Sequence, residues 1–303
     1  MRLSGFTFVR DAETLGYPVE ASIRSILPLC DEFVVVLGRS SDRTEALLER
    51  IGSPKLRILR TEWDPELARA GAVYALQTDI GLHACRGDWA FYLQADEVLH
   101  ERFLPVVEKA LVRLDGEPRV EGLLFDFLHF FGDYRHVQTS HNWYGREVRL
   151  VRTGRGIHAW HDAQGFRRWG RKLRVAHSGA CIFHYGWVHP CGGLWRKAEA
   201  RRRGYGLPAR SCAAPRGHGR LRGIVPFRGT HPETMRDRIG SASWSLRPSG
   251  ETYKHDRLGV RLLSFVENRL VGRRIGERRN YVWLRGYDRH PRGLAWRRWV
   301  DGI

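Results

Sequence analysis

The sequence predicts an α/β protein in which a Rossmann-type sheet is flanked by helices. Over the first 130 residues, short runs of β-favouring residues alternate with helical patterns, which is typical of βαβ units and a mainly parallel sheet. Residues 33–37 are apolar without interruption, as expected of a strand that is covered on both faces. From residue 122 the segments are longer and alternate, so we expect a mixed section of the sheet.

The elements of the first half follow one another in a regular order. We expect strands at residues 6–9, 33–37, 56–59 and 89–93. Apolar residues at helical spacing predict helices from about residue 17, at residues 42–48 and at residues 65–85. Asp42 stands three residues ahead of Glu45, which is typical of a capping box at the start of the second helix.

The second half of the chain has a different composition. Strands are expected at residues 122–131, 147–151 and 175–185. Beyond residue 190 the chain is rich in arginine and irregular, and helical patterns return around residues 232–244 and 258–276. We therefore divide the chain into an α/β unit at residues 1–190 and a basic, mainly helical C-terminal extension at residues 191–303.

Charge is distributed unevenly along the chain. Residues 1–133 contain 15 Lys and Arg against 22 Asp and Glu, whereas residues 134–303 contain 36 against 11, a balance of +25. This asymmetry indicates a face for an anionic partner: a lipid headgroup, a lipid-linked phosphate, an acidic glycan or nucleic acid. A solvated, arginine-rich surface is the simpler alternative.

Neither a zinc site nor a disulfide framework is indicated. The five cysteines are widely spaced and include no CxxC pair, so we expect free thiols. No apolar run approaches the roughly 18 residues of a membrane span, and no signal-peptide core follows Met1. We expect a cytoplasmic protein, either free or peripheral at the inner face of the membrane.

Polar residues follow three of the early strands at the edge where ligands of open α/β sheets bind. They are Asp11, Glu13, Ser40, Asp42, Gln94 and Asp96. Two acidic clusters on either side of a small-residue loop suit a nucleotide diphosphate only if a cation neutralises the pyrophosphate. Mg²⁺ or Mn²⁺ is the expected cofactor, because these ions prefer carboxylate and phosphate oxygens.

Three segments in this order resemble the family 2 glycosyltransferases of bacteria, which have the GT-A fold. They are residues 10–13, residues 40–44 and residues 87–97, and the resemblance extends over residues 3–190. It implies a GT-A-like mixed sheet and a hexosyltransferase, inverting in type, that uses a nucleotide-sugar donor. The acceptor implied is a glycan or lipid-linked precursor of the bacterial cell surface.

The resemblance also implies roles for individual residues. The family's Asp-x-Asp motif is here Gln94-Ala-Asp96, in which Asp96 keeps the metal role and Gln94 lies at the donor position. His184 stands where the family often supplies a histidine to the metal. The alternatives are a helix-capping role for Asp96 and a packed strand-end position for His184. Leu37 replaces an Asp that contacts the donor base, which leaves base recognition open.

An inverting transfer requires a general base for the acceptor hydroxyl. The segment at residues 147–162 is similar to the family's base region, so Asp162 is the predicted base and Glu147 the reserve. Asp162 is otherwise an exposed loop residue, and Glu147 a partner of Arg146 or Arg149.

Two further classes of function remain open. The basic, aromatic-rich second half is compatible with nucleic-acid binding, although no recognition-helix, zinc-finger or RNP-type pattern is present. Because Gln94 breaks the usual motif, a GT-A-fold nucleotidyltransferase or a non-catalytic relative is the other alternative.

Overall fold

The computed structural model describes most of the 303 residues. The structure does not describe residues 65, 68–71, 205–207, 209–216, 219–222, 250–256, 273, 277–278, 285, 288–293, 295 and 301–303, nor the side chains of residues 200, 201, 203, 204 and 298. The description therefore includes the whole predicted α/β unit except five residues.

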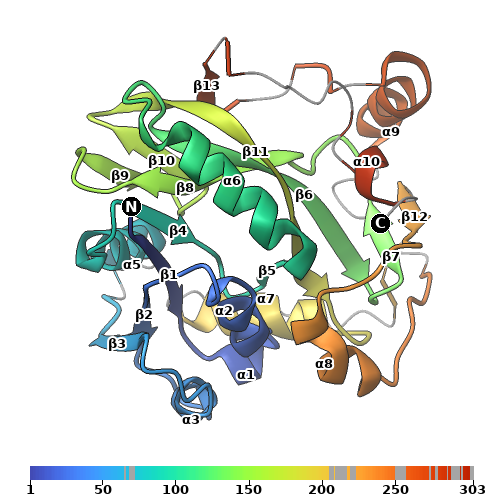
Figure 1. Ribbon diagram of the computed structural model, residues 1–303. Helices are drawn as coiled ribbons and strands as arrows, with labels where there is room; N and C mark the ends of the chain where they lie inside the picture. Colours follow the sequence, from blue (N-terminus) through green and yellow to red (C-terminus); the bar gives the residue numbers. More distant parts are fainter. Residues whose placement is uncertain are drawn as a thin grey trace.

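One long mixed sheet runs through the molecule, in the order β3-β2-β1-β4-β8-β6-β11-β10-β9 (Figure 1). Four parallel strands form its first part: β1 (Leu3–Val9), β2 (Glu32–Gly38), β3 (Leu56–Thr61) and β4 (Trp89–Tyr92). The central strands are β8 (Arg146–Arg152), β6 (Gly122–Gly132) and β11 (Arg171–Val188). Because β8 is antiparallel to both β4 and β6, β6 and β11 run in the same direction as β1 to β4.

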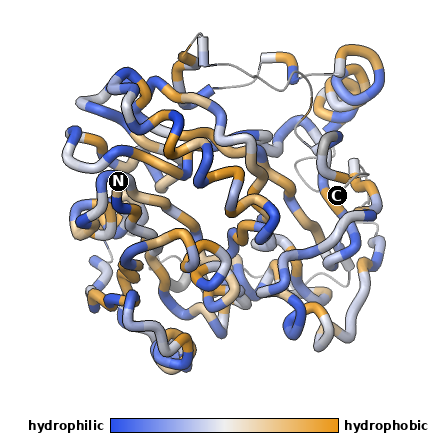
Figure 2. The backbone as a smooth tube through the Cα atoms, viewed as in Figure 1, coloured by the Kyte–Doolittle hydropathy of each residue, from blue (hydrophilic) through white to orange (hydrophobic). Residues whose placement is uncertain are grey.

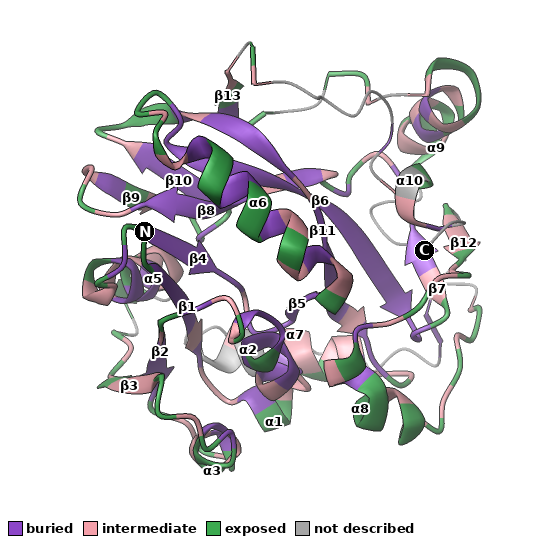
Figure 3. Ribbon diagram, in the orientation of Figure 1, coloured by how far each residue is buried: buried purple, intermediate pink, exposed green. Residues whose placement is uncertain are grey.

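Helices cover both faces of this sheet, and two hydrophobic clusters result. On one side lie α2 (Val19–Ile26) and α6 (Leu104–Asp115), and on the other α5 (Ala72–Ala84). Val35 of β2 belongs to the first cluster, and Val34 and Val36 belong to the second. Figure 3 shows α6 with one buried and one exposed face. The prediction of a mixed α/β sheet flanked by helices is confirmed.

Short elements connect these layers. The helical ones are α1 (Ala12–Leu15), α3 (Thr44–Glu49) and the 3₁₀ turn η1 (Glu101–Phe103). The strands are β5 (Glu97–Leu99), β7 (His136–Gln138), β9 (Ile157–Trp160) and β10 (Gly165–Arg168). At the start of α3, the backbone N–H of Thr44 donates to Asp42 Oδ1 at 3.0 Å, whereas Glu45 bonds Arg60 at 2.7 Å. The N-cap of α3 is Arg43, which forms no side-chain cap, so the predicted capping box from Asp42 to Glu45 is wrong.

The described residues after 190 form several helices and two short strands. Their helices are α7 (Gly193–Gly204), η2 (Glu233–Met235), α8 (Arg236–Gly240), α9 (Leu258–Phe265), a π-helical segment η4 (Val266–Val271) and α10 (Arg297–Val300). Two strands, β12 (Ile224–Pro226) and β13 (Tyr281–Trp283), pair with β7 and β11. Trp299 Nε1 donates to buried Asp126 Oδ2 at 3.1 Å. These contacts attach described parts of the chain after residue 190 to the sheet.

The apolar residues lie mainly within the sheet and the faces that cover it (Figure 2). Among the described residues, no helix is both long and apolar enough to cross a membrane. The four described cysteines, Cys30, Cys85, Cys181 and Cys191, are not joined by disulfide bonds. Cys212 lies outside the described residues.

Candidate active site

The loops that follow β1 and β2 are braced against each other at the carboxyl edge of the sheet. Asp11 adopts a left-handed backbone conformation with φ of 50°, and its Oδ1 accepts the N–H of Ser41 at 2.7 Å. In return, Asp42 Oδ2 accepts the N–H of Thr14 at 2.8 Å. Burial raises the pKa of Asp42, but hydrogen bonds from Thr14 and Thr44 outweigh burial and lower this pKa. The structure therefore brings Asp11 and Asp42 into adjoining loops, as the sequence predicts.

Ser40 and Glu13 also form contacts that connect these two loops. Ser40 Oγ accepts the N–H of Asp11 at 3.0 Å and donates to the carbonyl of Gly38 at 3.0 Å. Glu13 forms an exposed ion pair with Arg43, whose hydrogen bonds lower the pKa of Glu13. Many of the polar atoms of Asp11, Glu13, Ser40 and Asp42 are thus used to hold the two loops in place.

Asp96 follows β4 and faces two cationic or basic side chains. Its Oδ2 lies 3.7 Å from His184 Nε2 and 3.4 Å from Lys197 Nζ, and the residue is 9% exposed. Burial raises the pKa of Asp96, but the charge of Lys197 outweighs burial and holds this pKa below its ordinary value. The pairing of β5 with β11 places Glu97 opposite His184, so strand register brings Asp96 and His184 together across 88 residues of chain.

A second histidine fixes the ring of His184. His129 Nδ1 lies 2.9 Å from His184 Nδ1, and His129 Nε2 lies 2.7 Å from the carbonyl oxygen of Tyr144. A carbonyl only accepts, so His129 carries its proton on Nε2. Burial and the neighbouring His184 lower the pKa of His129 well below its usual value, so its ring is neutral and its Nδ1 accepts from His184 Nδ1–H. In neutral His184 the remaining lone pair is therefore on Nε2, facing Asp96.

Lys197 enters the site from α7, which packs against α1. Its Nζ donates to the carbonyl of Gly186 at 2.9 Å and lies 4.2 Å from the ring centroid of Tyr17. The sequence analysis did not identify Lys197, because it lies in an arginine-rich stretch that resembles a solvated surface. Its position in the helix that follows β11, a strand that ends at this edge, was the available signal.

Glu97 and Arg149 form a buried ion pair beneath the site. Arg149 Nε and Nη2 each lie 2.7 Å from a carboxylate oxygen of Glu97, and the guanidinium lies over the rings of Tyr92 and Phe127. Glu97 also accepts the N–H of half-buried Gln94 at 3.1 Å. This pair fixes the loop that carries Gln94 and Asp96.

Asp96 and His184 can supply two ligands to a divalent cation, and a bound substrate would supply others. Two donors of one ion, each about 2.1 Å from it, are separated by about 3 to 4 Å, and the Asp96–His184 distance of 3.7 Å falls in this range. A Cβ at Gly186 would lie 2.3 Å from Asp96 Oδ2 and 2.7 Å from His184 Nε2, so glycine keeps the space between them open. Within the described residues no group of three or more His, Cys, Asp or Glu could hold a metal. Diphosphate oxygens and water would have to supply the other ligands.

The structure does not bring Asp162 to this site. Asp162 is exposed in the turn between β9 and β10, a hairpin that pairs with Arg171 and Lys172 at the start of β11. His184 lies toward the other end of the same strand, which separates the two residues by most of the length of β11. Glu147 lies on β8 opposite Phe125, in the same strand row as Arg149. The other carboxylates of this region, Asp126 and Asp133, bond Arg146 and His136.

Comparison with known proteins gives only distant likenesses to solved structures. No protein-family model and no curated protein matches the chain. Among solved structures, S. aureus TarS 1-349 is 12% identical to this chain. The match covers 67% of this chain and 65% of that chain at a TM-score of 0.40. For the same protein in complex with UDP the TM-score is 0.42. Glucosyl-3-phosphoglycerate synthase from Mycobacterium tuberculosis, in complex with Mn²⁺, UDP and phosphoglyceric acid, is 21% identical and covers 42% of this chain and 43% of that chain at 0.29. The matched region is thus less than two thirds of each solved chain.

Proposed function

We propose that the chain is a metal-dependent glycosyltransferase that moves a sugar from a nucleotide-sugar donor to a glycan or lipid-linked acceptor. The observation that carries this proposal is the pair formed by Asp96 Oδ2 and His184 Nε2, 3.7 Å apart at the carboxyl edge of the sheet. His129 supports the pair by fixing the tautomer that leaves the Nε2 lone pair of His184 free for a cation. A strand-end histidine with only a packing role would not need this arrangement.

Each residue of the site then has a defined task. Asp96 and His184 would hold the cation, which would supply positive charge for the leaving nucleoside diphosphate. Lys197 adds a fixed positive charge beside Asp96 and supplies N–H donors to phosphate oxygens. The braced loops that carry Asp11 and Ser40 form the neighbouring edge, where the nucleoside would lie.

The finer assignments follow from the resemblance and belong to the same proposal. We assign the donor a hexose and the reaction an inverting course, in which a carboxylate deprotonates the acceptor hydroxyl. Glu147 is the preferred base, since it lies on the central strand β8 together with Arg149. Asp162 is the second candidate for the base. It could act only if the acceptor binds against the β9–β10 hairpin. Glu147→Gln should reduce turnover by about 10² or more, and Asp162→Asn should leave it near that of the wild type.

The pathway is the synthesis of bacterial cell-surface polysaccharide, and the location is the cytoplasmic side of the membrane. The balance of +25 in residues 134–303 supports an anionic acceptor or surface. The acidic edge formed by Asp11, Glu13 and Asp42 argues against a simple nucleic-acid-binding module, because such a module does not require a cluster of carboxylates.

A donor screen tests the proposed function. Release of nucleoside diphosphate should be measured from UDP-sugars and GDP-sugars, with Mn²⁺, with Mg²⁺ and with a chelator. We expect release with at least one donor, dependent on the cation, and absent in His184→Ala. Release of pyrophosphate from a nucleoside triphosphate and a sugar phosphate would instead identify a nucleotidyltransferase. Binding of nucleotide without turnover of any donor would indicate a non-catalytic relative.

A further inference from the structure

The helix α9 and the π-helical segment η4 turn their apolar side chains outward. Leu258, Leu262 and Phe265 are 76%, 65% and 57% exposed, and Leu270 is 71% exposed. The spacing of four and three residues between the first three places them on one side of the helix. In Figure 2 this coil, at the upper right edge of the molecule, is coloured largely as hydrophobic. Exposed apolar residues grouped in this way mark an interaction surface.

Polar residues hold the opposite side of the same segment against the protein. Ser264 and Glu267 are buried, and Ser264 Oγ accepts the N–H of His141 at 2.9 Å. Glu267 Oε1 lies 2.8 Å from His141 Nδ1, and Glu267 Oε2 accepts from Arg274 at 2.7 Å. An amphipathic helix of a water-soluble domain has its polar side in solvent. Here several apolar side chains are exposed while Ser264 and Glu267 face the protein, and hydrogen bonds and ion pairs fix this orientation.

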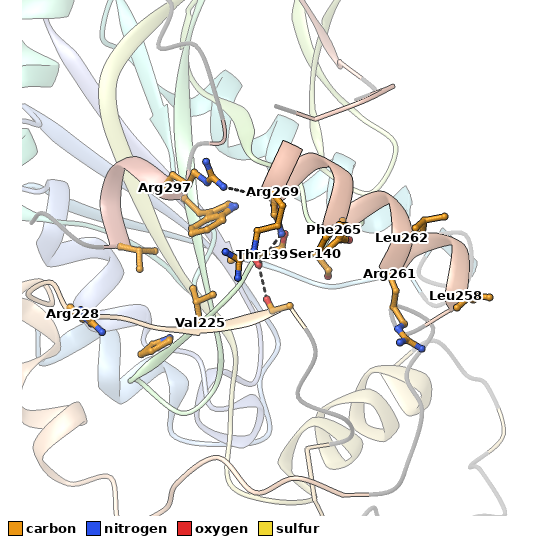
Figure 4. Close-up of a pocket in the computed structure, with 16 residues that line it drawn as sticks. Thr139, Ser140, Val225, Arg228, Leu258, Arg261, Leu262, Phe265, Arg269 and Arg297 are labelled. Atoms are coloured by element: carbon orange, nitrogen blue, oxygen red, sulfur yellow. Dashed lines mark hydrogen bonds between the residues drawn. The ribbon is translucent and has the colours of Figure 1, made fainter. Parts of the chain in front are cut away.

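Arginines surround the outward apolar side chains. A groove of about 1070 Å³ lies between α9 and η4 on one side and β12 and α10 on the other (Figure 4). Its cationic lining consists of Arg228, Arg261, Arg269 and Arg297. No carboxylate lines the groove among the residues that the structure describes, so its walls combine positive charge with apolar surface.

We propose that this surface, formed by α9, η4 and the arginines of the groove, docks on an anionic phospholipid bilayer. The apolar side chains of Leu258, Leu262 and Phe265 would enter the boundary between headgroups and acyl chains, as in interfacial helices. Arg261 and Arg269 would lie at the level of the lipid phosphates, and Trp296 in the groove suits the same interface. Charge complementarity favours this occupant over a second copy of the chain, which has the same positive groove and a net charge of +18.

The docking surface is connected to the candidate active site through one loop. Thr139 and Ser140 line the groove, and His141 anchors η4. Three residues further on, the carbonyl of Tyr144 holds His129. A bilayer bound at this surface would therefore adjoin the loop that supports the site. Membrane binding does not require the proposed transferase activity, so each proposal can fail without the other.

Vesicle co-sedimentation of the full chain tests the proposal. The probes are vesicles of phosphatidylcholine alone and of phosphatidylcholine with phosphatidylglycerol. We expect binding to the anionic vesicles only, and release as salt rises past the point where the Debye length is about 8 Å. Leu262→Glu with Phe265→Glu should reduce the partition coefficient more than about tenfold, and Arg261→Ala with Arg269→Ala by roughly fivefold for each arginine.

Matched controls come from α6, which also has an exposed apolar residue and an adjacent arginine. Val112 is 68% exposed, and Val112→Glu with Arg113→Ala should leave vesicle binding within about twofold of the wild type. Because all substituted residues are at least partly exposed, circular dichroism should be unchanged, and the arginine variant tests the surface should the glutamate variant fail to fold.

Three results would overturn the proposal. The first is a wild type that ignores anionic vesicles, whether or not it retains single-stranded nucleic acid in the same salt. The second is equal vesicle binding by the α9 variants and the α6 control. The third is a wild-type dimer that the α9 glutamate variant converts to a monomer, since a second copy would then cover the face.

Discussion

His129 orients His184 through a contact of 2.9 Å between their Nδ1 atoms. The residues lie on neighbouring strands β6 and β11 at the same register position. The backbone carbonyl of Tyr144 fixes the proton of His129, and His129 in turn fixes the proton of His184. The carbonyl of Tyr144 thus determines, through two successive hydrogen bonds, which nitrogen of His184 has the lone pair that faces Asp96. Residues that hydrogen-bond to a metal ligand commonly orient the ligand in this way.

Removing His129 should weaken the cation site without removing a ligand. For His129→Ala we expect Mn²⁺ affinity, measured by calorimetry with UDP or GDP present, to fall about 10-fold to 100-fold. His231→Ala is the matched control, because His231 is a half-buried imidazole that, like His129, is bonded to a backbone carbonyl, that of Tyr134 at 2.8 Å. The control should lose stability and keep its Mn²⁺ affinity. Equal affinities in the two variants would show that His129 has only a packing role.

Lys197 should contribute to binding of the diphosphate and not replace the cation. A hydrogen bond to a charged group contributes about 1.5–3 kcal/mol, so Lys197→Ala should weaken nucleotide binding at least about tenfold in the presence of Mn²⁺. Arg196→Ala, an exposed neighbour on α7, is the control and should bind as the wild type does. If wild-type binding persists undiminished in a chelator and only Lys197→Ala abolishes it, Lys197 is itself the counter-charge of the diphosphate.

The buried pair of Glu97 and Arg149 should be a large contributor to stability. Glu97 is fully buried and Arg149 is 1% exposed, so Glu97→Ala leaves an uncompensated charge and should lower the free energy of unfolding by about 3–5 kcal/mol. The double variant Glu97→Leu, Arg149→Met should recover most of the loss. Glu20→Ala breaks an exposed pair and should cost less than about 1 kcal/mol. Urea unfolding measures all three, and similar losses for Glu97→Ala and Glu20→Ala would contradict the expectation.

Glu121 should make stability depend on pH in the acid range. Burial raises its pKa, but hydrogen bonds from Arg171, Arg174 and Arg168 outweigh burial and lower the pKa from 4.5 to about 2. Because the folded-state pKa is the lower one, the stabilisation is present above pH 4.5 and is lost as pH falls toward 2. In Glu121→Gln the free energy of unfolding should be lower at pH 7 and decline less between pH 4.5 and 2. Parallel curves for wild type and variant would contradict this.

Local sequence patterns predicted the first half of the fold well. The apolar run at residues 33–37 became β2, and the strand expected at residues 122–131 became β6 with one residue added. These elements are fixed by their own composition, because a strand buried on both faces needs apolar residues throughout. The sequence also predicted a helix at residues 258–276, but it could not show that the apolar side faces away from the protein.

Long-range register decided the parts that the sequence did not predict. Asp162 was chosen from a local similarity, and nothing near it indicates that its hairpin joins the start of the 18-residue strand β11. His129 looked like any residue of a buried strand until β6 paired with β11. Lys197 depends on the packing of α7 against α1, which no short pattern encodes.

The most direct test of the central claim is the nucleotide affinity of Asp96→Ala with and without Mn²⁺. Asp96 lies in the loop between β4 and β5 and belongs to neither hydrophobic cluster, so the variant should fold, as circular dichroism will verify. Calorimetric titration of UDP and GDP should show that Mn²⁺ increases the affinity of the wild type for one of them. In Asp96→Ala this increase should disappear, and an increase equal to that of the wild type would contradict a cation site at Asp96 and His184.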